Sequence, residues 1–362
     1  MATIVENIQT LQSIKTDIKD AIISKGVSVG NDFRTYAQAI TDLPSGGGGG
    51  TEMEDAFVQR TLGGYYSNDR VSKVGGYALT GFSTLTSVNF PNCTFIGESA
   101  FTYCSALTSV YIPKCTSVGA SAFNECSALT SVNFPNCTSV GDYAFFYCTS
   151  LTSVNLPNCI SVGERVFYGC SALTSIDLTN CITIGGDAFS DCRALTSVNF
   201  PNCTSIGYYA FYRCSALTSV NLPKCTYAYG GLFMDCKSLT SVNIPNCITI
   251  GGYAFMGCSA LTSVNLPNCK IVENQAFDGC SALTSVYIPN CSYINYYAFN
   301  NCTNLTQVYL NSVTIVTIIS STTFKNCPNL TSVYVPSSLV DAFKVKTYWS
   351  SMSNKIVAYT GA

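Results

Sequence analysis

Histidine is absent from all 362 residues of the chain. Without an imidazole, the chain has no Ser-His-Asp or Cys-His catalytic arrangement and no histidine-ligated metal site. Charged side chains are also scarce, at 10% of residues, and 18 basic against 20 acidic side chains give a net charge of -2. A nucleic-acid-binding surface needs an excess of basic side chains to neutralise phosphates, so we expect no nucleic-acid partner.

Long apolar runs are missing too. No stretch of about 18 or more residues is continuously apolar, so the sequence predicts no membrane-spanning helix. Residues 1–22 are amphipathic and charged, which is unlike the apolar core of a secretory signal peptide. For a chain with 21 cysteines, folding in a reducing cytoplasm is therefore the expectation.

The sequence does contain a long internal repeat. The tetrad Leu-Thr-Ser-Val, with occasional Gln or Ile replacements, recurs every 22 residues, and only the last interval is 25. Its copies begin at Leu85, Leu107, Leu129, Leu151, Leu173, Leu195, Leu217, Leu239, Leu261, Leu283, Leu305 and Leu330. Such a period is typical of a solenoid, in which stacked units bury a common core that no single unit can form.

One unit shows how each coil is built. Val88 and Phe90 are two residues apart and share one face of a short strand, which Pro91 ends. Gly97 permits a turn, and the following Ala-Phe segment predicts a short helix or an irregular turn. Cys93 stands where the leucine-rich repeat pattern has Asn or Cys. The predicted fold class is a leucine-rich-repeat solenoid of short parallel strands plus short helices or turns, with a small N-terminal helical module.

The cysteines follow the same period in two columns. One column runs from Cys93 to Cys291 and the other from Cys104 to Cys327. Metal binding, disulfide bonds and a ladder of buried free thiols are the alternatives. We favour the ladder, because the repeat accounts for every cysteine and neither a Cys-x-x-Cys pair nor a histidine is present. No catalytic residue, metal ligand or cofactor is predicted.

The second half of each unit carries a recognisable pattern. It reads Ile/Val-Gly-x-x-Ala-Phe-x-x-Cys and leads into Leu-Thr-Ser-Val, as in Ile96 to Val110. This pattern resembles the BspA-like, or Treponema-type, leucine-rich repeats of bacterial and phage surface proteins, and it covers residues 71–336. The resemblance implies a non-enzymatic protein that acts in adhesion to host proteins or cells.

The first 44 residues have a different pattern. Apolar residues from Ile4 to Ile22 are spaced by three or four, which predicts one stripe along a helix. Ile18–Ile22, Lys25–Val29 and Phe33–Ile40 together resemble an N-terminal module of bacteriophage tail and tail-fibre-type proteins. That resemblance implies attachment to virion tail proteins, and a helical cap or a homo-oligomerisation hairpin is the alternative.

These patterns predict five segments. They are a helical attachment or oligomerisation module at 1–44, a Gly-rich linker at 45–50, an N-terminal cap with a partial repeat at 51–82, the solenoid at 83–336, and a C-terminal cap at 337–362. In the last segment we expect Trp349 to close the apolar end of the solenoid rather than to bind a ligand.

The units differ mainly at the positions on either side of Ala-Phe, where many of the 23 tyrosines lie. Drift on a solvated face is one interpretation. A recognition surface is the other, because tyrosine provides rigid amphipathic contact area. One cluster on neighbouring units predicts a binding patch, consisting of Tyr143, Phe146, Tyr147, Tyr168, Tyr208, Tyr209 and Tyr212.

The sequence thus predicts a non-enzymatic binding protein. The first hypothesis is a tail-associated host-recognition component of a phage virion, made in the host cytoplasm, whose partner is a bacterial surface protein or glycan. The alternatives are a bacterial cell-surface adhesin of the same repeat family and a purely structural virion protein.

Overall fold

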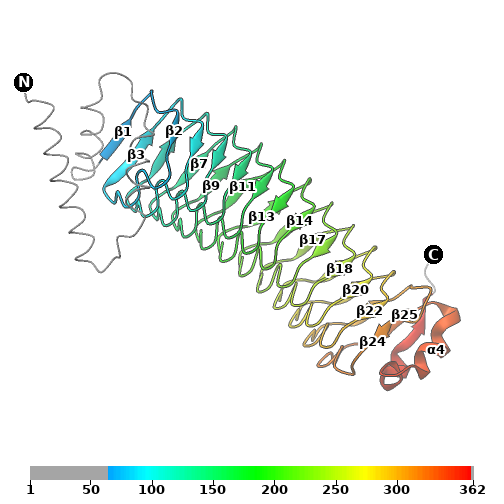
Figure 1. Ribbon diagram of the computed structural model, residues 1–362. Coiled ribbons are helices and arrows are strands. Elements are labelled where there is room, and N and C mark those ends of the chain that lie inside the picture. Colours follow the sequence, from blue (N-terminus) through cyan, green and yellow to red (C-terminus); the bar gives the residue numbers. More distant parts are fainter. Residues whose placement is uncertain (1–63, 360–362) are drawn as a thin grey trace, which may run out of the picture.

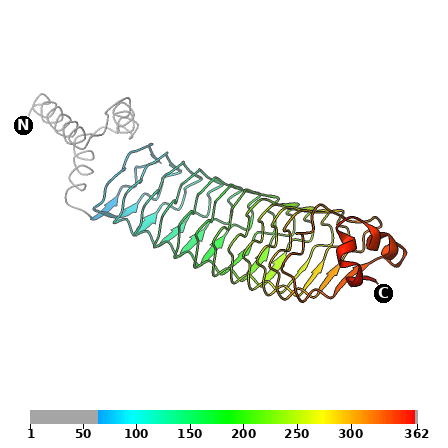
Figure 2. The same ribbon diagram turned by 90° about the horizontal axis from the view of Figure 1, so that it is seen from below.

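The computed structural model describes residues 64–359, which form an elongated solenoid of stacked coils (Figure 1). Each 22-residue unit contributes one coil, and the coils follow one another from the N-terminal to the C-terminal end (Figure 2). The predicted solenoid of short parallel strands is confirmed. The predicted module at 1–44, the linker at 45–50 and the start of the cap at 51–63 lie outside the described residues.

The Leu-Thr-Ser-Val tetrads form the first ladder of parallel strands. Within a sheet, most neighbouring strands pair at a register of one repeat, as in Ser87 with Ser109 and Val88 with Val110. The strands are β1 (Gly64–Ser67), β3 (Leu85–Asn89), β5 (Ser109–Tyr111), β7 (Ser131–Asn133), β9 (Ser153–Asn155), β11 (Ser175–Asp177), β13 (Ser197–Asn199), β15 (Ser219–Asn221), β17 (Ser241–Asn243), β19 (Ser263–Asn265), β21 (Ser285–Tyr287), β23 (Gln307–Tyr309), β25 (Ser332–Val335) and β26 (Ile356–Ala358). Strand pairing divides this ladder into four sheets, each parallel throughout.

A second ladder, which the repeat pattern did not predict, lies on another side of the coils. Its two-residue strands are β2 (Lys73–Val74), β4 (Phe95–Ile96), β6 (Ser117–Val118), β8 (Ser139–Val140), β10 (Ser161–Val162), β12 (Thr183–Ile184), β14 (Ser205–Ile206), β16 (Tyr227–Ala228), β18 (Thr249–Ile250), β20 (Ile271–Val272), β22 (Tyr293–Ile294) and β24 (Thr317–Ile318). They form a seven-stranded and a five-stranded parallel sheet. Two residues are too few to show the alternation by which a strand is recognised in a sequence.

The glycine after this short strand stands at the start of the predicted turn. The N–H of Ala100 donates to the carbonyl of Gly97 at 3.4 Å, and the φ of Gly97 is not among the positive values. A Cβ on Gly97 would lie 2.5 Å from the backbone nitrogen of Gly76 in the preceding coil. The glycine therefore allows two backbones to approach closely rather than supplying a left-handed conformation.

Turns, not helices, occupy the Ala-Phe half of each coil. Of the two predicted alternatives, the irregular turn is the one that forms. The N–H groups of Tyr143, Phe145 and Tyr147 donate to carbonyl oxygens of the next coil, at 2.8–2.9 Å. In a helix these N–H groups would donate to carbonyl oxygens four residues earlier in the same segment. Here the hydrogen bonds between coils replace those helical bonds.

Polar ladders stabilise the outside of the stack. The hydroxyl of Thr108 donates to the carbonyl of Thr86 in the preceding coil, at 2.9 Å, and equivalent bonds recur along the chain. The amide of Asn155 donates to the side-chain oxygen of Asn133, at 2.8 Å. The uniform Thr and Asn positions of the repeat are thus explained by bonds between coils.

A continuous column of phenylalanine rings runs through the core. Neighbouring rings are stacked with centroids 5.0–5.5 Å apart, beginning with the pair Phe101 and Phe123 and ending with the pair Phe299 and Phe324. The two cysteine columns lie beside them, and all 21 cysteines are buried free thiols. Each thiol of the second column donates to a carbonyl of the preceding coil, as Cys126 does to Phe101 at 3.1 Å.

Helical segments are found at the C-terminal end of the stack. They are the 3₁₀ helix η1 (Ser337–Leu339), the helix α4 (Val340–Val345) and the 3₁₀ helix η2 (Trp349–Lys355), which cover the last coil (Figure 1). Phe343 and Trp349 are fully buried there, and the indole N–H of Trp349 donates to the carbonyl of Val316 at 2.8 Å. These contacts shield the apolar end of the core from water.

Candidate functional site

The variable positions beside Ala-Phe form three columns along one edge of the solenoid. In the central coils, the first outer column contains Tyr143, Arg165, Asp187 and Tyr209. The second outer column contains Phe146, Tyr168, Ser190, Tyr212 and Met234, and the third contains Tyr147, Gly169, Asp191 and Arg213. Residues far apart in the sequence thus become neighbours at intervals of one coil.

The backbone holds the first and third outer columns in the left-handed region. Tyr143 has a φ of 58° and Tyr147 a φ of 52°, while Tyr209 has a φ of 56°. This region costs a non-glycine residue about 1–2 kcal/mol. The bonds between coils described above offset that cost and fix the direction in which these side chains leave the backbone.

Six of the seven predicted site residues line one open hollow of about 550 Å³, named here the tyrosine hollow. Its lining is Tyr143, Phe146, Tyr147, Arg165, Tyr168, Asp187, Tyr209, Tyr212 and Met234. Within the second outer column, the short side chain of Ser190 lies between Tyr168 and Tyr212. Ser190 is buried, and its hydroxyl donates to the carbonyl of Tyr209 at 2.7 Å. A larger side chain at this position would lie between two residues of the lining, Tyr168 and Tyr212.

Aromatic rings support one another on both sides of the tyrosine hollow. Phe146 stacks on Tyr168 with centroids 5.2 Å apart, and Tyr147 meets the edge of Phe146 at 4.6 Å. On the opposite side, Tyr209 and Tyr212 make an edge contact at 5.9 Å. The contacts with neighbouring rings fix Tyr147 and Tyr209 in place. Both residues are also open to solvent, being 44% and 38% exposed.

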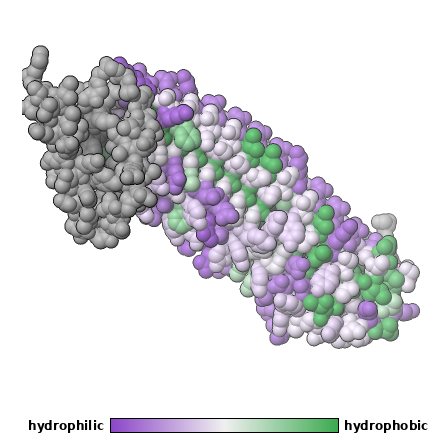
Figure 3. Space-filling model, viewed as in Figure 1, coloured by the Kyte–Doolittle hydropathy of each residue, from purple (hydrophilic) through white to green (hydrophobic). Residues whose placement is uncertain are grey.

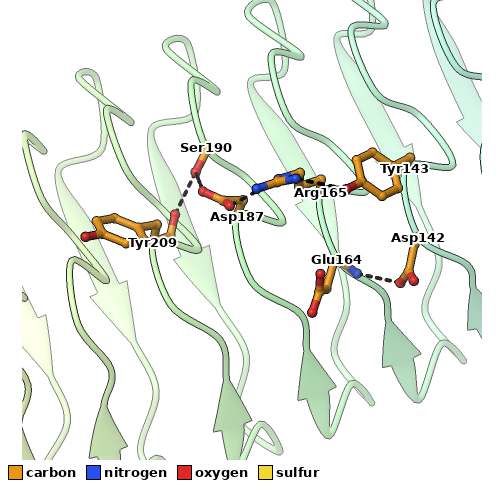
Figure 4. A network of polar contacts seen from close by, with 7 residues as sticks. All are labelled: Asp142, Tyr143, Glu164, Arg165, Asp187, Ser190 and Tyr209. Atoms are coloured by element: carbon orange, nitrogen blue, oxygen red, sulfur yellow. Dashed lines mark hydrogen bonds and ion pairs between the residues drawn. The ribbon is translucent and has the colours of Figure 1, made fainter.

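Arg165 and Asp187, which both line the same hollow, form an ion pair (Figure 4). The guanidinium of Arg165 donates to a carboxylate oxygen of Asp187 at 3.2 Å and to the hydroxyl of Tyr143 at 2.9 Å. The bond to Tyr143, followed by the bond to Asp187, raises the pKa of Arg165. Desolvation, followed by the nearby Tyr147, raises the pKa of Tyr168. The charged side chains of the lining are Arg165 and Asp187, which form an ion pair with each other.

Tyr208 is the predicted site residue that does not line the tyrosine hollow. It is 58% exposed and makes an edge contact with Tyr229 at 5.1 Å instead. Arg165, Asp187 and Met234 line the hollow but were not predicted as site residues. They occupy the same variable columns as the tyrosines but are not aromatic, so the aromatic pattern does not indicate them.

Figure 3 shows hydrophobic residues in small separate groups on the face it presents. Residues 64–359 contain no group of three side chains suited to a metal ion. Over the same range, none of the helices has the length and apolar content that crossing a bilayer requires. The tyrosine hollow is suited to binding through aromatic contact and hydrogen bonds.

A further tyrosine group lies on the first strand ladder near the C-terminal end. Tyr309 and Tyr334 are stacked at 4.7 Å, and Tyr287 and Tyr359 adjoin them at 6.0–6.5 Å. All four are only partly exposed, because their rings contact one another.

Comparison with known proteins identifies the repeat. The sequence matches the BspA type leucine-rich repeat region over residues 53–162, 116–236 and 226–353. A leucine-rich repeat protein from Bacteroides ovatus is 21% identical, with 83% of this chain and 85% of that chain covered and a TM-score of 0.49. A leucine-rich cell surface protein from Faecalibacterium prausnitzii is 24% identical, with 82% and 91% covered and a TM-score of 0.46.

A third solved structure, the leucine-rich repeat protein of T. pallidum, is 26% identical. The alignment covers 52% of this chain and 82% of that chain, with a TM-score of 0.40. None of the curated proteins matches this chain. The family match extends across most of the sequence and agrees with the repeat pattern and the stacked coils. The chain belongs to the family of BspA-type leucine-rich repeat proteins.

Proposed function

We propose that this protein is a non-enzymatic recognition protein that binds a bacterial surface protein or glycan through the tyrosine hollow. The observation that carries the proposal is the set of fixed, exposed rings around that hollow, above all Tyr147 and Tyr209. Aromatic anchors in preformed concave sites contribute most of the free energy in many interfaces. Their orientation by the backbone lowers the entropic cost of binding.

The family supports a binding role. Leucine-rich repeat proteins are generally a binding and scaffold class rather than an enzymatic one. The hollow supports it chemically, because Arg165 is engaged with Asp187 and Tyr143, and the other lining groups are phenols, a phenyl ring and a thioether. Such groups bind and orient a ligand but supply no activated nucleophile.

Two settings fit this proposal. Attachment to a phage tail is supported by the sequence of residues 1–44, whereas the usual location of BspA-type proteins at the cell surface supports a bacterial adhesin. A purely structural virion protein is the remaining alternative, and the exposed aromatic rings that line the tyrosine hollow favour a binding role over it. The genes beside the coding sequence separate the settings: tail or baseplate genes support the virion, and envelope or secretion genes support the adhesin.

Binding to whole cells tests the proposed function. Fluorescently labelled full-length protein is incubated with a panel of bacterial strains, and the double variant Tyr209→Ser/Tyr212→Ser is compared with Tyr297→Ser. Tyr297 also has a φ of 56° and occupies the first outer column, far from the hollow. We expect at least a tenfold loss for the double variant, which corresponds to about 1.4 kcal/mol or more for the pair, and none for the control. Equal binding by all three proteins would refute the proposal.

Self-association belongs to the same proposal. We infer that the apolar stripe from Ile4 to Ile22 joins copies of the chain or docks it on a virion protein. Light scattering on the full-length protein and on Leu11→Asp/Ile18→Asp measures this. A lower mass for the variant supports homo-oligomerisation. If both proteins are monomers, homo-oligomerisation is excluded.

A further inference from the structure

A second hollow of about 580 Å³ lies next to the tyrosine hollow. Its lining is Tyr103, Ser105, Glu125, Ser127, Tyr147 and Thr149. These residues come from three successive coils, at the third outer column and two residues beyond it. We name it the serine hollow. Tyr147 lines both hollows, so the two hollows adjoin at this ring.

We propose, on the basis of the proposed function, that the two hollows form one groove for a linear, uncharged oligosaccharide. The chain would lie along the solenoid axis, with Tyr147 between its two subsites. Binding positions along the axis recur at the coil spacing, which is about 4.8 Å in a parallel ladder. That repeat is close to the length of one hexose in an extended chain.

The rings of Tyr147 and Tyr209 each lie over a glycine of the next coil and present a flat surface. A Cβ on Gly169 would lie 2.8 Å from the ring of Tyr147, so the ring leans over a position without a side chain. The ring of Tyr209 covers Gly231 in the same way. Each ring is backed by the protein on one side and partly exposed. Sugar rings present C–H faces that stack on such surfaces, while their hydroxyl groups bond to neighbouring polar groups.

The charges of the groove favour a neutral ligand. Arg165 is the cation of the lining, and its charge is compensated by the carboxylate of Asp187. Arg165 therefore does not compensate the carboxylate of Glu125 in the serine hollow. An acidic polymer would meet this carboxylate and no unpaired cation of the lining. The serine and threonine hydroxyls suit hydrogen bonding to sugar hydroxyls better than they suit an apolar anchor residue of a protein partner.

The first experiment separates sugar from protein as the ligand. Bacterial strains that bind the full-length protein are treated with periodate, which cleaves vicinal diols of sugars, or with protease. We expect periodate to abolish binding and protease to leave it unchanged. If protease alone abolishes binding, and Tyr209→Ser/Tyr212→Ser still impairs it, the oligosaccharide proposal fails and the proposed function stands. If no strain is bound, both fail.

The second experiment tests the groove. Polysaccharide released from the bound cells is cut, separated by charge and length, and titrated calorimetrically into the full-length protein. We expect neutral fragments to bind more tightly as they lengthen from disaccharide to hexasaccharide. Tyr147→Ser should lower the affinity of the long fragments about tenfold or more and leave the disaccharide affinity within about twofold.

Two further variants control the groove experiment. Tyr147→Phe should restore binding of the long fragments, because it keeps the ring, and Tyr296→Ser should have no effect. Tyr296 is 42% exposed, much like Tyr147, but lies on a distant coil. Preference for acidic fragments, affinity independent of length, or full binding by Tyr147→Ser would each overturn the proposal.

Discussion

Raising the pH should unfold this protein through its cysteine columns. Burial is the main cause that raises the thiol pKa of Cys159, Cys203 and Cys247 to about 12 and that of Cys181 to about 11, from an ordinary value of 9.0. Because the folded pKa is the higher one, the unfolded chain loses these protons first. The stabilisation is therefore complete below about pH 9 and is lost as the pH rises from 9 towards 12.

The expected loss is large. One pH unit above the unfolded pKa, each thiol that stays protonated in the fold lowers the free energy of unfolding by about 1.4 kcal/mol. Four such thiols lower it by about 6 kcal/mol at pH 10, which is comparable with the whole stability of many domains. We therefore expect a steep fall in the urea midpoint between pH 9 and pH 10.

Urea denaturation followed by circular dichroism at several pH values measures this loss. The variant Cys159→Ala/Cys181→Ala/Cys203→Ala/Cys247→Ala should show a shallower dependence on pH, whatever its stability at pH 7. A thiol reagent provides a second measurement that needs no variant: folded protein at pH 8 should react very slowly, and urea should expose all 21 thiols. Equal slopes for both proteins, or rapid reaction of the folded thiols, would refute the reasoning.

Three substitutions test other features of the fold. Phe189→Ala removes a fully buried ring from the middle of the phenylalanine column and should cost about 3–5 kcal/mol in urea denaturation, with hydrogen exchange accelerated most in the neighbouring coils. Glu125→Gly should stabilise the protein by about 0.5–1 kcal/mol, because Glu125 has a φ of 55° and glycine adopts this conformation without strain. Trp349→Phe leaves the buried carbonyl of Val316 without its donor and should cost about 1–3 kcal/mol, seen as a lower thermal midpoint; an unchanged midpoint would contradict that role for the indole.

The repeat made the main architecture predictable. Because every unit places the same residue type at the same position, alignment of Val88 with Val110 satisfies strand pairing, core packing and polar ladders together. The second strand ladder was not predictable in the same way, since residues such as Phe95 and Ile96 make up a whole strand. The absence of a helix around Tyr143 depends on hydrogen bonds to the next coil, which a single unit does not reveal.

The site was predictable as a region but not as a set of contacts. The 22-residue period brings Tyr147, Tyr168 and Tyr212 to one edge, so their proximity follows from the register. The neighbours Tyr208 and Tyr209 look equivalent in the sequence, yet only Tyr209 lines the tyrosine hollow. The partner of Arg165 also depends on side-chain direction, which the left-handed backbone sets and composition does not reveal.

Filling the tyrosine hollow tests the central claim most directly. In Ser190→Tyr, the new ring would lie between Tyr168 and Tyr212, in a column that already accepts aromatic residues. Met256→Tyr makes the same type of change in that column outside the hollow, and thermal unfolding establishes that both variants are folded. The account predicts that Ser190→Tyr abolishes binding to bacterial cells while Met256→Tyr binds like the original protein. Undiminished cell binding by folded Ser190→Tyr would contradict it.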